Sequence, residues 1–403
     1  MEKQLIGSLR EKPFYKPLII SSVFVCLVLI LWLGTTIVTS PKWLQIDDYV
    51  EYWAAGNLNL KGGNPYDPQQ LLPLQHAAGR FFGVPVMMWN PPWMLLLAMP
   101  FSVFTYPLSR VLWILFFIII ILLSVNLTWQ QYGGKPQYRW VGWLVGFTFL
   151  PVLEAFRTGQ TGPLLLLGMA GFLYFYNKKR LWLAGGCLSL LLVKPHILYL
   201  VLIAVVLWSL YEKELRIILG AGITLAFATL VTWVVNPDVI QQYLFAAVNY
   251  PPEDWATPTI GGITRLLIGT QHFWLQFIPT LVGLLWISIY WYHRRLAWSW
   301  LEQAPLIILV SILTAAYGWT SDHSASLIPI LQIFILLLLV QDKKRSWYLV
   351  LISYLVIEIL LFVPFGNQIW NFWLAPSLLL WYLVSRRALT GTAPLVEGSR
   401  SVD

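Results

Sequence analysis

Long apolar segments recur along most of this chain of 403 residues. A helix needs about 20 apolar residues to cross the hydrocarbon core of a bilayer, which is about 30 Å thick. Residues 17–38 meet this requirement, and no small-residue cleavage site follows them, so they predict a retained span. Hydrophobic residues make up 58% of the chain and charged residues 11%, whereas a water-soluble domain has about 25% charged residues. The sequence therefore predicts an all-α polytopic membrane protein.

Other segments of similar composition bring the predicted number of spans to twelve. They are residues 108–129, 140–156, 161–176, 181–193, 196–210, 215–235, 279–292, 303–319, 324–340, 346–363 and 369–385. Residues 90–104 are left out, because about 14 residues between prolines suit an interfacial or re-entrant helix better than a span. Within 181–210 the break at Val193-Lys194-Pro195 allows two short spans or one kinked helix. Two spans are favoured, because the flanks NKKR and YEKELR both carry the basic residues typical of the cytoplasmic side.

Basic residues predict how this bundle lies in the membrane. With twelve spans and both termini in the cytoplasm, 19 of the 26 Lys and Arg residues are cytoplasmic, in line with the positive-inside tendency. If residues 90–104 also crossed, later clusters such as Lys178-Lys179-Arg180 would face outward. The net charge of +8 thus reflects topology and does not predict binding of nucleic acid. Two long outer loops are predicted, at about 39–107 and 236–278, with juxtamembrane helices in the first.

The chain contains no repeat of fixed period and no low-complexity linker. It predicts one transmembrane domain over residues 1–385, followed by a polar, disordered cytoplasmic tail over residues 386–403. Cys26 and Cys187 both lie in apolar segments, which argues against a disulfide framework or a cysteine metal site.

A few charged residues remain on the predicted outer side, close to the ends of spans. Arg157, Lys194 and Arg265 stand where a charge is unfavourable without a partner. A phosphate at the membrane surface would accept hydrogen bonds from such cations, and snorkelling to lipid headgroups is the alternative. Asp322 and His323 share a short outer turn, where Asp322 either caps the next helix or contributes to a site.

Two adjacent carboxylates, Asp47 and Asp48, lie near the start of the first outer loop. Neighbouring side chains point in different directions on a helix or a strand, so at most one of the two faces a site. A carboxylate at this position could act as the general base for an acceptor hydroxyl. The alternative is a solvated acid beside a membrane exit.

These motifs together resemble glycosyltransferase family 87, from about Asp48 to His323. The first loop contains the family's Asp, its Tyr-aromatic pair and its PYD sequence, here Asp48, Tyr52-Trp53 and Pro65-Tyr66-Asp67. NPPWMLLLAMPF, GQTGPLLLL, LAGGCLSLLLVKPHILYL and WTSDHSASLIP follow in the family's order. One position departs from the pattern, because the Asn that usually follows the Gln by two residues is Gly162 here.

The resemblance implies a membrane enzyme of the GT-C architecture in a bacterial plasma membrane, similar to the mannosyltransferases that extend phosphatidylinositol mannosides. Such an enzyme transfers a hexose, most often mannose, with inversion from a polyprenyl-phosphate donor to a lipid-linked or glycan acceptor at the outer membrane face. The implied site has Asp48 as the base, Asp47 as the fallback, His323 beside the base or the phosphate, Arg157, Lys194 and Arg265 as donor-phosphate ligands, and Tyr52, Gln160 and Asp322 as substrate-lining residues.

No cofactor is expected, because the donor's own phosphate is the leaving group and no glycine-rich nucleotide loop is found. No metal is expected either, and a metal held by Asp48 and Asp322 is the alternative. The main rival is a lipid or glycan transporter, or flippase, which would use ionisable residues near mid-membrane such as Glu358. Transporters also commonly contain inverted repeats, and none is visible here. A non-catalytic assembly protein would have no need for the outer Asp, His, Arg and Lys residues.

Overall fold

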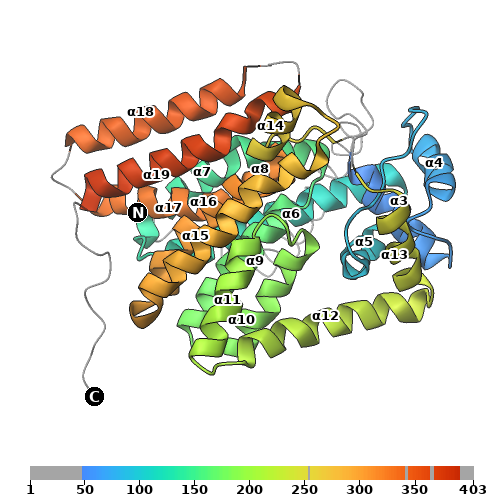
Figure 1. Ribbon diagram of the computed structural model, residues 1–403, viewed down its shortest axis with the longest axis horizontal. Helices are drawn as coiled ribbons and strands as arrows, with labels where there is room; N and C mark the ends of the chain where they lie inside the picture. Colours follow the sequence, from blue (N-terminus) through green and yellow to red (C-terminus); the bar gives the residue numbers. More distant parts are fainter. Residues whose placement is uncertain (1–47, 253–254, 341–343, 364–366, 391–403) are drawn as a thin grey trace, which may run out of the picture.

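The computed structural model describes residues 48–252, 255–340, 344–363 and 367–390. Every regular element in these ranges is a helix, as the apolar segments predict. The helices form a large bundle and a smaller cap at one end of it (Figure 1). The predicted first span, residues 17–38, lies outside the described residues, as does Asp47.

The cap consists of the helices of the first outer loop and one helix of the second. They are α3 (Tyr49–Leu60), α4 (Pro68–Ala77), the 3-10 helix η1 (Pro92–Met94), α5 (Leu95–Ser102) and α13 (Val239–Asn249). The apolar residues 90–104 thus form the short η1 and α5 pair, which packs against α3 within a separate hydrophobic core. Helices in the first loop were predicted, and their orientation relative to a membrane stays a prediction.

The remaining helices make up the bundle and its connections. They are α6 (Tyr106–Gln131), η2 (Pro136–Tyr138), α7 (Arg139–Thr148), α8 (Leu150–Thr158), α9 (Gly162–Asn177), α10 (Leu181–Leu188), η3 (Ser189–Val193), α11 (Tyr199–Tyr211), α12 (Arg216–Val235), α14 (Ile260–Ile268), η4 (Phe273–Phe277), α15 (Ile278–Arg294), η5 (Arg295–Ala297), α16 (Trp300–Thr314), η6 (Thr320–Ser326), α17 (Leu327–Leu339), α18 (Lys344–Leu361), η7 (Gln368–Trp373) and α19 (Leu374–Thr390). The helix α19 continues into the predicted tail, and residues 391–403 lie outside the described residues.

Four helical stretches in the described ranges are long and apolar enough to cross a membrane, by length and composition. They are Tyr106–Gln131, Arg216–Val235, Phe273–Ala297 and Thr320–Leu339. Other apolar helices, such as Gly162–Asn177 and Trp300–Thr314, are shorter than the about 20 residues that a simple span needs. The predicted total of twelve spans therefore stays a prediction.

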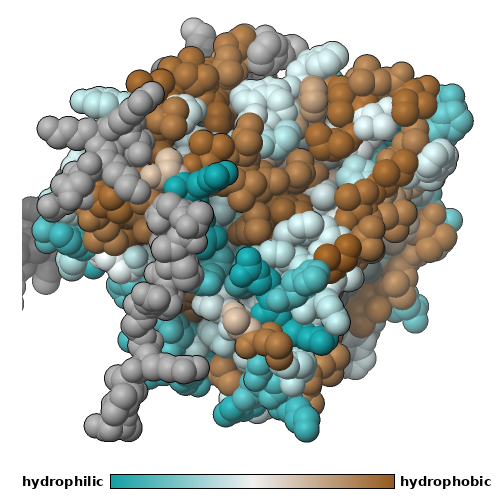
Figure 2. All heavy atoms as spheres, turned by 60° about the vertical axis from the view of Figure 1, so that its left-hand side comes forward, coloured by the Kyte–Doolittle hydropathy of each residue, from teal (hydrophilic) through white to brown (hydrophobic). Residues whose placement is uncertain are grey.

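Large apolar side chains cover much of the surface of the bundle. Figure 2 shows one such face, and along α15 the side chains of Leu281, Leu285 and Ile289 are each more than half exposed. On α18 the same is true of Ile352 and Ile359. A soluble domain rarely exposes so much contiguous apolar surface, whereas a lipid-facing surface requires it. The fold therefore supports a membrane protein.

Loops that are far apart in the sequence meet at the end of the bundle remote from the cap. The helix α6 runs about 39 Å from the cap, where Ser109 contacts Tyr49, to the far end, where Asn177 Nδ2 donates to Gln131 Oε1 at 2.9 Å. At that same end the hydroxyl of Tyr132 donates to the carbonyl oxygen of Leu301 at 3.1 Å. These loops carry predicted cytoplasmic basic residues, namely Lys135, Arg139, Lys178, Lys179, Arg180, Lys213, Arg216, Arg294 and Arg295. Their gathering at one end agrees with the predicted topology, and the membrane side of that end stays a prediction.

The chain reverses direction at Lys194, where the sequence predicts a break. The 3-10 helix η3 ends at Val193, and α11 begins only at Tyr199. Two cap side chains satisfy carbonyl groups that the break leaves without helical partners, because Asn90 Nδ2 donates to Val193 O and Trp93 Nε1 donates to Leu192 O, each at 3.0 Å. The two halves of 181–210 are therefore separate helices, with Lys194 at the turn between them.

A second break separates α7 from α8 and explains the isolated acid on α18. Pro151 follows Leu150 at the start of α8, so the backbone N–H of Leu150 needs a partner from outside its own helix. Glu358 Oε2 accepts from this N–H at 2.9 Å, and Glu358 is buried. The carboxylate is thus part of the helix packing.

We expect Glu358→Leu to destabilise the protein by about 1–3 kcal/mol, because a buried N–H loses its acceptor. The apparent Tm of the purified protein in detergent should fall by several degrees. Glu358→Gln keeps a carbonyl acceptor, so its apparent Tm should fall less than that of Glu358→Leu. The conservative Ile359→Leu change, at a position 62% exposed on the same helix, is the control. A Glu358→Leu protein as stable as the control would contradict this role.

Candidate functional site

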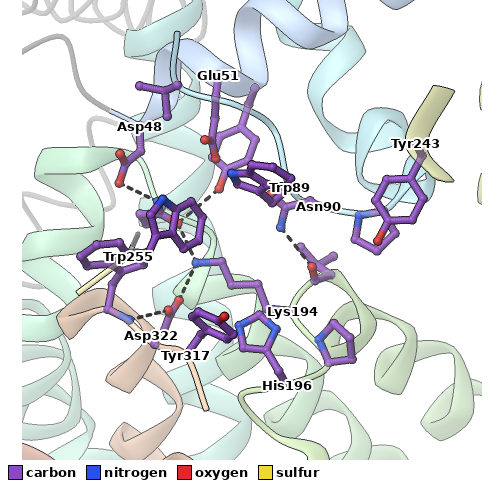
Figure 3. Close-up of a pocket in the computed structure, with 18 residues that line it drawn as sticks. Asp48, Glu51, Trp89, Asn90, Lys194, His196, Tyr243, Trp255, Tyr317 and Asp322 are labelled. Atoms are coloured by element: carbon purple, nitrogen blue, oxygen red, sulfur yellow. Dashed lines mark hydrogen bonds and ion pairs between the residues drawn. The ribbon is translucent and has the colours of Figure 1, made fainter. Parts of the chain in front are cut away.

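A cavity of about 270 Å³ lies where the cap meets the bundle (Figure 3). Side chains from α3, from the loop before η1, from the turn before α9, from the break at Lys194 and from the turn before η6 line it. Its polar lining consists of Asp48, Glu51, Tyr52, Asn90, Gln160, Lys194, His196 and Asp322, together with aromatic side chains described below. The cavity therefore collects groups that are up to 274 positions apart, from Asp48 to Asp322.

The helix α3 contributes Asp48, Glu51 and Tyr52. Asp48 immediately precedes the helix, and a spacing of three and four residues directs all three side chains to one face. The neighbouring Tyr49 anchors the helix, because its hydroxyl donates to Ser109 O of α6 at 3.1 Å. Glu51 is only 6% exposed, so α3 places a second carboxylate deep beside Asp48.

The turn between α8 and α9 presents Gln160. Gly159 adopts a φ of +86°, a conformation that glycine reaches without strain. Two side chains of α6 hold this turn in place. Arg110 Nη2 donates to the carbonyl oxygens of Phe156 and Arg157 at 2.8 and 2.7 Å, and Trp113 Nε1 donates to Gly159 O at 3.0 Å. The same helix therefore fixes both α3 and the Gln160 turn.

The amide of Gln160 joins three elements of the site. Its Nε2 donates to Asp48 Oδ2 at 2.5 Å. Its Oε1 accepts from Lys194 Nζ at 2.7 Å and from the hydroxyl of Tyr52 at 3.2 Å. Since an ammonium group can only donate, these contacts determine which end of the amide faces Asp48.

Lys194 and Asp322 form a buried ion pair, with Nζ 2.8 Å from Oδ1. The other oxygen of Asp322 accepts from the backbone N–H of Trp319 at 2.9 Å, at the start of η6. Asp322 thus caps this helix and pairs with Lys194 at the same time, so the two alternatives that the sequence left open are compatible. Losing one partner of such a pair typically costs about 3–5 kcal/mol.

The surroundings of two further groups shift their pKa values. Burial raises the pKa of Tyr52 well above its ordinary value, and the charges of Glu51 and Asp48 act in the same direction. The phenol therefore stays protonated and can donate to Gln160. The ring of His196 opens into the cavity, where the surrounding protein atoms lower its pKa to about 4 although Asp322 acts against this shift. This shift favours the neutral imidazole of His196.

Five of the predicted site residues come together in this cavity: Asp48, Tyr52, Gln160, Lys194 and Asp322. His323 is buried next to Asp322 but does not line the cavity, and its Nδ1 lies 3.3 Å from Trp319 O. Asp48 receives its hydrogen bond from Gln160 and not from His323. Of the two roles predicted for His323, the contact with Asp48 is therefore not seen, and the contact with a phosphate stays a prediction.

The structure does not place Arg157 and Arg265 in the cavity. The guanidinium of Arg157 pairs with Glu154, one helical turn earlier, at 2.6 and 2.9 Å. Arg265 donates to Thr270 O at 2.8 Å and to Gln276 Oε1 at 3.0 Å, and it stacks on Phe273. Both cations thus have partners that are close to them in the sequence. The sequence alone could not distinguish these two cations from Lys194.

Sequence reasoning missed part of the lining: Glu51, Trp89, Asn90, His196, Tyr243, Trp255, Tyr317 and Trp319. The spacing of Glu51 from Asp48 was a usable signal, and so was the position of His196 two residues after Lys194. The aromatic residues gave no signal, because Trp and Tyr are abundant throughout the chain. Among the described residues, no group of three or more His, Cys, Asp or Glu side chains could hold a metal ion.

The family model described as Glycosyltransferase family 87 matches residues 89–325, which is more than half of the chain. This stretch contains Gln160, Lys194 and Asp322, and it begins after Asp48 and after α3, the helix that carries Tyr52. Neither the curated proteins nor the solved structures give a significant match.

Close packing at Gly162 leads to a prediction for this site. A Cβ atom there would lie 2.2 Å from Ser321 O, next to Asp322. No Asn could occupy this position without moving η6. We expect Gly162→Ala to displace the Asp322 turn and to destabilise the protein by about 1–3 kcal/mol, measured as a lower apparent Tm.

Gly222 on α12 is the matched control, because a Cβ atom there meets nothing within 4 Å. Gly222→Ala should leave the Tm unchanged or raise it, since alanine is the better helix former. Equal Tm values for the two variants would mean that the Gly162 contact does not constrain the site.

Proposed function

We propose, from the premise that this chain belongs to glycosyltransferase family 87, that it transfers a hexose from a polyprenyl-phosphate donor to a lipid-linked or glycan acceptor. Mannose is the first sugar to test. The observation that carries this proposal is the connected set of Asp48, Gln160, Lys194 and Asp322 inside one cavity. In this set the amide of Gln160 lies between the carboxylate of Asp48 and the ammonium of Lys194 and bonds to both.

Asp48 is the proposed base. It removes the proton of an acceptor hydroxyl, whose oxygen forms a bond to the anomeric carbon of the donor sugar. The bond from that carbon to the phosphate oxygen breaks, and polyprenyl phosphate leaves with the electron pair. A single displacement of this kind inverts the anomeric configuration. Positioned general bases contribute about 10²- to 10⁴-fold in rate.

Lys194 is the proposed ligand of the leaving phosphate. An ammonium group has three N–H donors, and Gln160 and Asp322 accept from two of them. The third can donate to a phosphate oxygen while both existing contacts persist. Such a preorganised cation stabilises the negative charge that develops on the leaving group. The partners of Arg157 and Arg265 favour Lys194 for this role.

The size of the cavity favours a donor with a small polar head. At about 270 Å³ it lies just below the about 300–1,000 Å³ of sites for drug-sized ligands. One sugar unit suits this space, with the prenyl chain outside it along the apolar helices. The cavity lies at the end of the bundle remote from the basic loops, so the positive-inside tendency assigns it to the outer face. Both termini are then cytoplasmic, in a bacterial plasma membrane.

The transporter alternative has less support. Glu358, the isolated acid that would suit a proton or ion relay, accepts from the backbone of Leu150. This hydrogen bond to the backbone explains why Glu358 is buried without a role in transport.

We expect Asp48→Asn to lower the transfer rate by about 10²- to 10⁴-fold, because an amide cannot accept the hydroxyl proton. The measurement is transfer of radiolabelled hexose from a panel of polyprenyl-phosphate sugars by purified protein. Asp238→Asn, at an exposed position outside the cavity, should keep wild-type activity. Transfer by Asp48→Asn within about threefold of wild type would remove Asp48 from the mechanism.

We expect Gln160→Glu to shift the pH dependence of kcat/KM. The variant places a second carboxylate beside Asp48, and two such groups in contact share a proton near neutral pH. Since the base must be ionised, the acidic limb of the profile should move to higher pH, with activity returning as pH rises. Gln69→Glu adds the same charge at an exposed position of α4 and should leave the profile unchanged. An unshifted profile for Gln160→Glu would show that Gln160 does not act on the base.

A further inference from the structure

Four aromatic side chains converge on the cavity from three separate segments of the chain. Trp89 precedes η1, Trp255 lies between α13 and α14, and Tyr317 and Trp319 lie in the turn before η6. Trp255 is central, because its ring lies 6.0 Å from Trp89, 6.4 Å from Tyr317 and 5.9 Å from Trp319. We call these four residues the aromatic wall.

The aromatic wall is not part of a hydrophobic core. Core tryptophans of this protein, such as Trp113 and Trp129, are fully buried, whereas each member of the wall is only half-buried and lines the cavity. The wall also differs from aromatic residues on the outer surface of the bundle, such as Trp274, which is 63% exposed. Its accessible faces are therefore directed at whatever occupies the cavity.

The indole N–H groups of the wall are available for a ligand. Elsewhere the indoles of Trp53, Trp93 and Trp113 each donate to a backbone carbonyl oxygen at 3.0 Å. The indoles of Trp89, Trp255 and Trp319 donate to no acceptor within the part of the chain that the structure describes. Buried indoles usually find a partner for this donor, and a ligand with oxygen acceptors that fills the cavity would supply one.

Polar side chains line the same cavity between these rings. In Figure 3, Asp48 and Glu51 enter from the α3 side, with Trp89 beside Glu51, while Lys194 and His196 enter from the other side, with Tyr317 beside them. A ligand in the cavity therefore meets both aromatic rings and charged or polar groups. The ring of a sugar offers both kinds of contact, because its C–H groups form an apolar face and its hydroxyl groups surround the edge.

We infer that the aromatic wall is the subsite for the hexosyl ring of the donor. The inference rests on the proposed function and adds the position of the sugar. The wall takes the C–H face of the ring, its indole N–H groups donate to ring and hydroxyl oxygens, and the carboxylates accept from hydroxyl groups.

The prenyl chain of the donor is the other apolar group that could contact these rings. A chain at the wall would offer no acceptor to the indole N–H groups of Trp89, Trp255 and Trp319. Each buried donor or acceptor left unsatisfied costs about 1–3 kcal/mol. A sugar satisfies these groups, so the balance favours the sugar at the wall and the chain outside the cavity.

The test uses Trp255→Leu, which removes the central ring, and Trp255→Phe, which keeps a ring face and removes the N–H. The probes are a short-chain prenyl-phosphate mannose and the same prenyl phosphate without sugar. Calorimetry measures the Kd of both probes, and a transfer assay measures KM and kcat with the sugar probe. Trp274→Leu, outside the cavity, is the matched control.

For the sugar probe, we expect Trp255→Leu to raise Kd and KM about tenfold and Trp255→Phe about threefold, as loss of an aromatic contact implies. The Kd of the sugar-free probe should stay within about twofold of wild type for both variants. If Trp255→Leu lowers the Tm below that of the control, Trp255→Phe and Trp89→Phe decide the question in its place.

Two results would overturn the inference: unchanged affinity for the sugar probe, or an equal loss of affinity for the sugar-free probe, which would place the chain at the wall. The proposed function fails separately if wild type binds the sugar probe through Trp255 but transfers no sugar. If wild type transfers sugar and the Trp255 variants bind it normally, only the position of the sugar is wrong.

Discussion

The hydrogen-bonded amide of Gln160 is the contact on which the rest of the site depends. It accepts from Lys194 and donates to Asp48, so it joins the break between η3 and α11 to the start of α3. Each partner needs it for a different reason, because the buried ammonium of Lys194 requires acceptors and the half-buried carboxylate of Asp48 requires donors. Contacts outside the cavity hold this amide in position. The turn at Gly159 presents the amide, and Arg110 and Trp113 of α6 hold that turn while Tyr49 binds α3 to the same helix.

Much of the fold could be predicted because it depends on local sequence. Apolar segments with polar ends predict helices, and a proline after a charged residue predicts the break at Lys194, which the structure confirms. The family resemblance is also confirmed, since it rests on short motifs in a fixed order. The number of spans is harder to predict from the sequence, because breaks such as that at Leu150 divide apolar segments into helices that are too short to cross a membrane alone. Whether such pieces cross depends on packing against other helices, which no local pattern contains.

The site was predictable only in part, and the reason lies in long-range contacts. Lys194, Arg157 and Arg265 look alike in the sequence, as basic residues near the ends of apolar segments. The structure separates them by their partners: Asp322 lies 128 positions from Lys194, whereas Arg157 pairs with Glu154 of its own helix and Arg265 bonds to Thr270 and Gln276, at most 11 positions away. The same limit applies to Trp255, whose neighbours in space are Trp89, Tyr317 and Trp319. A sequence rich in tryptophan offers no means of selecting it.

The charge of the cavity restricts the donors that it can accept. Its lining contains three carboxylates, Asp48, Glu51 and Asp322, and one ammonium, Lys194. One of those carboxylates already pairs with Lys194, so a phosphate must share that cation with Asp322. A sugar attached through one phosphate brings a single site of negative charge to the one remaining N–H of Lys194. A diphosphate donor would bring more negative charge near Asp48 and Glu51, where like charges repel. Under the proposed function, the charges of this lining are therefore an argument for a lipid-phosphate sugar over a sugar carried on a diphosphate.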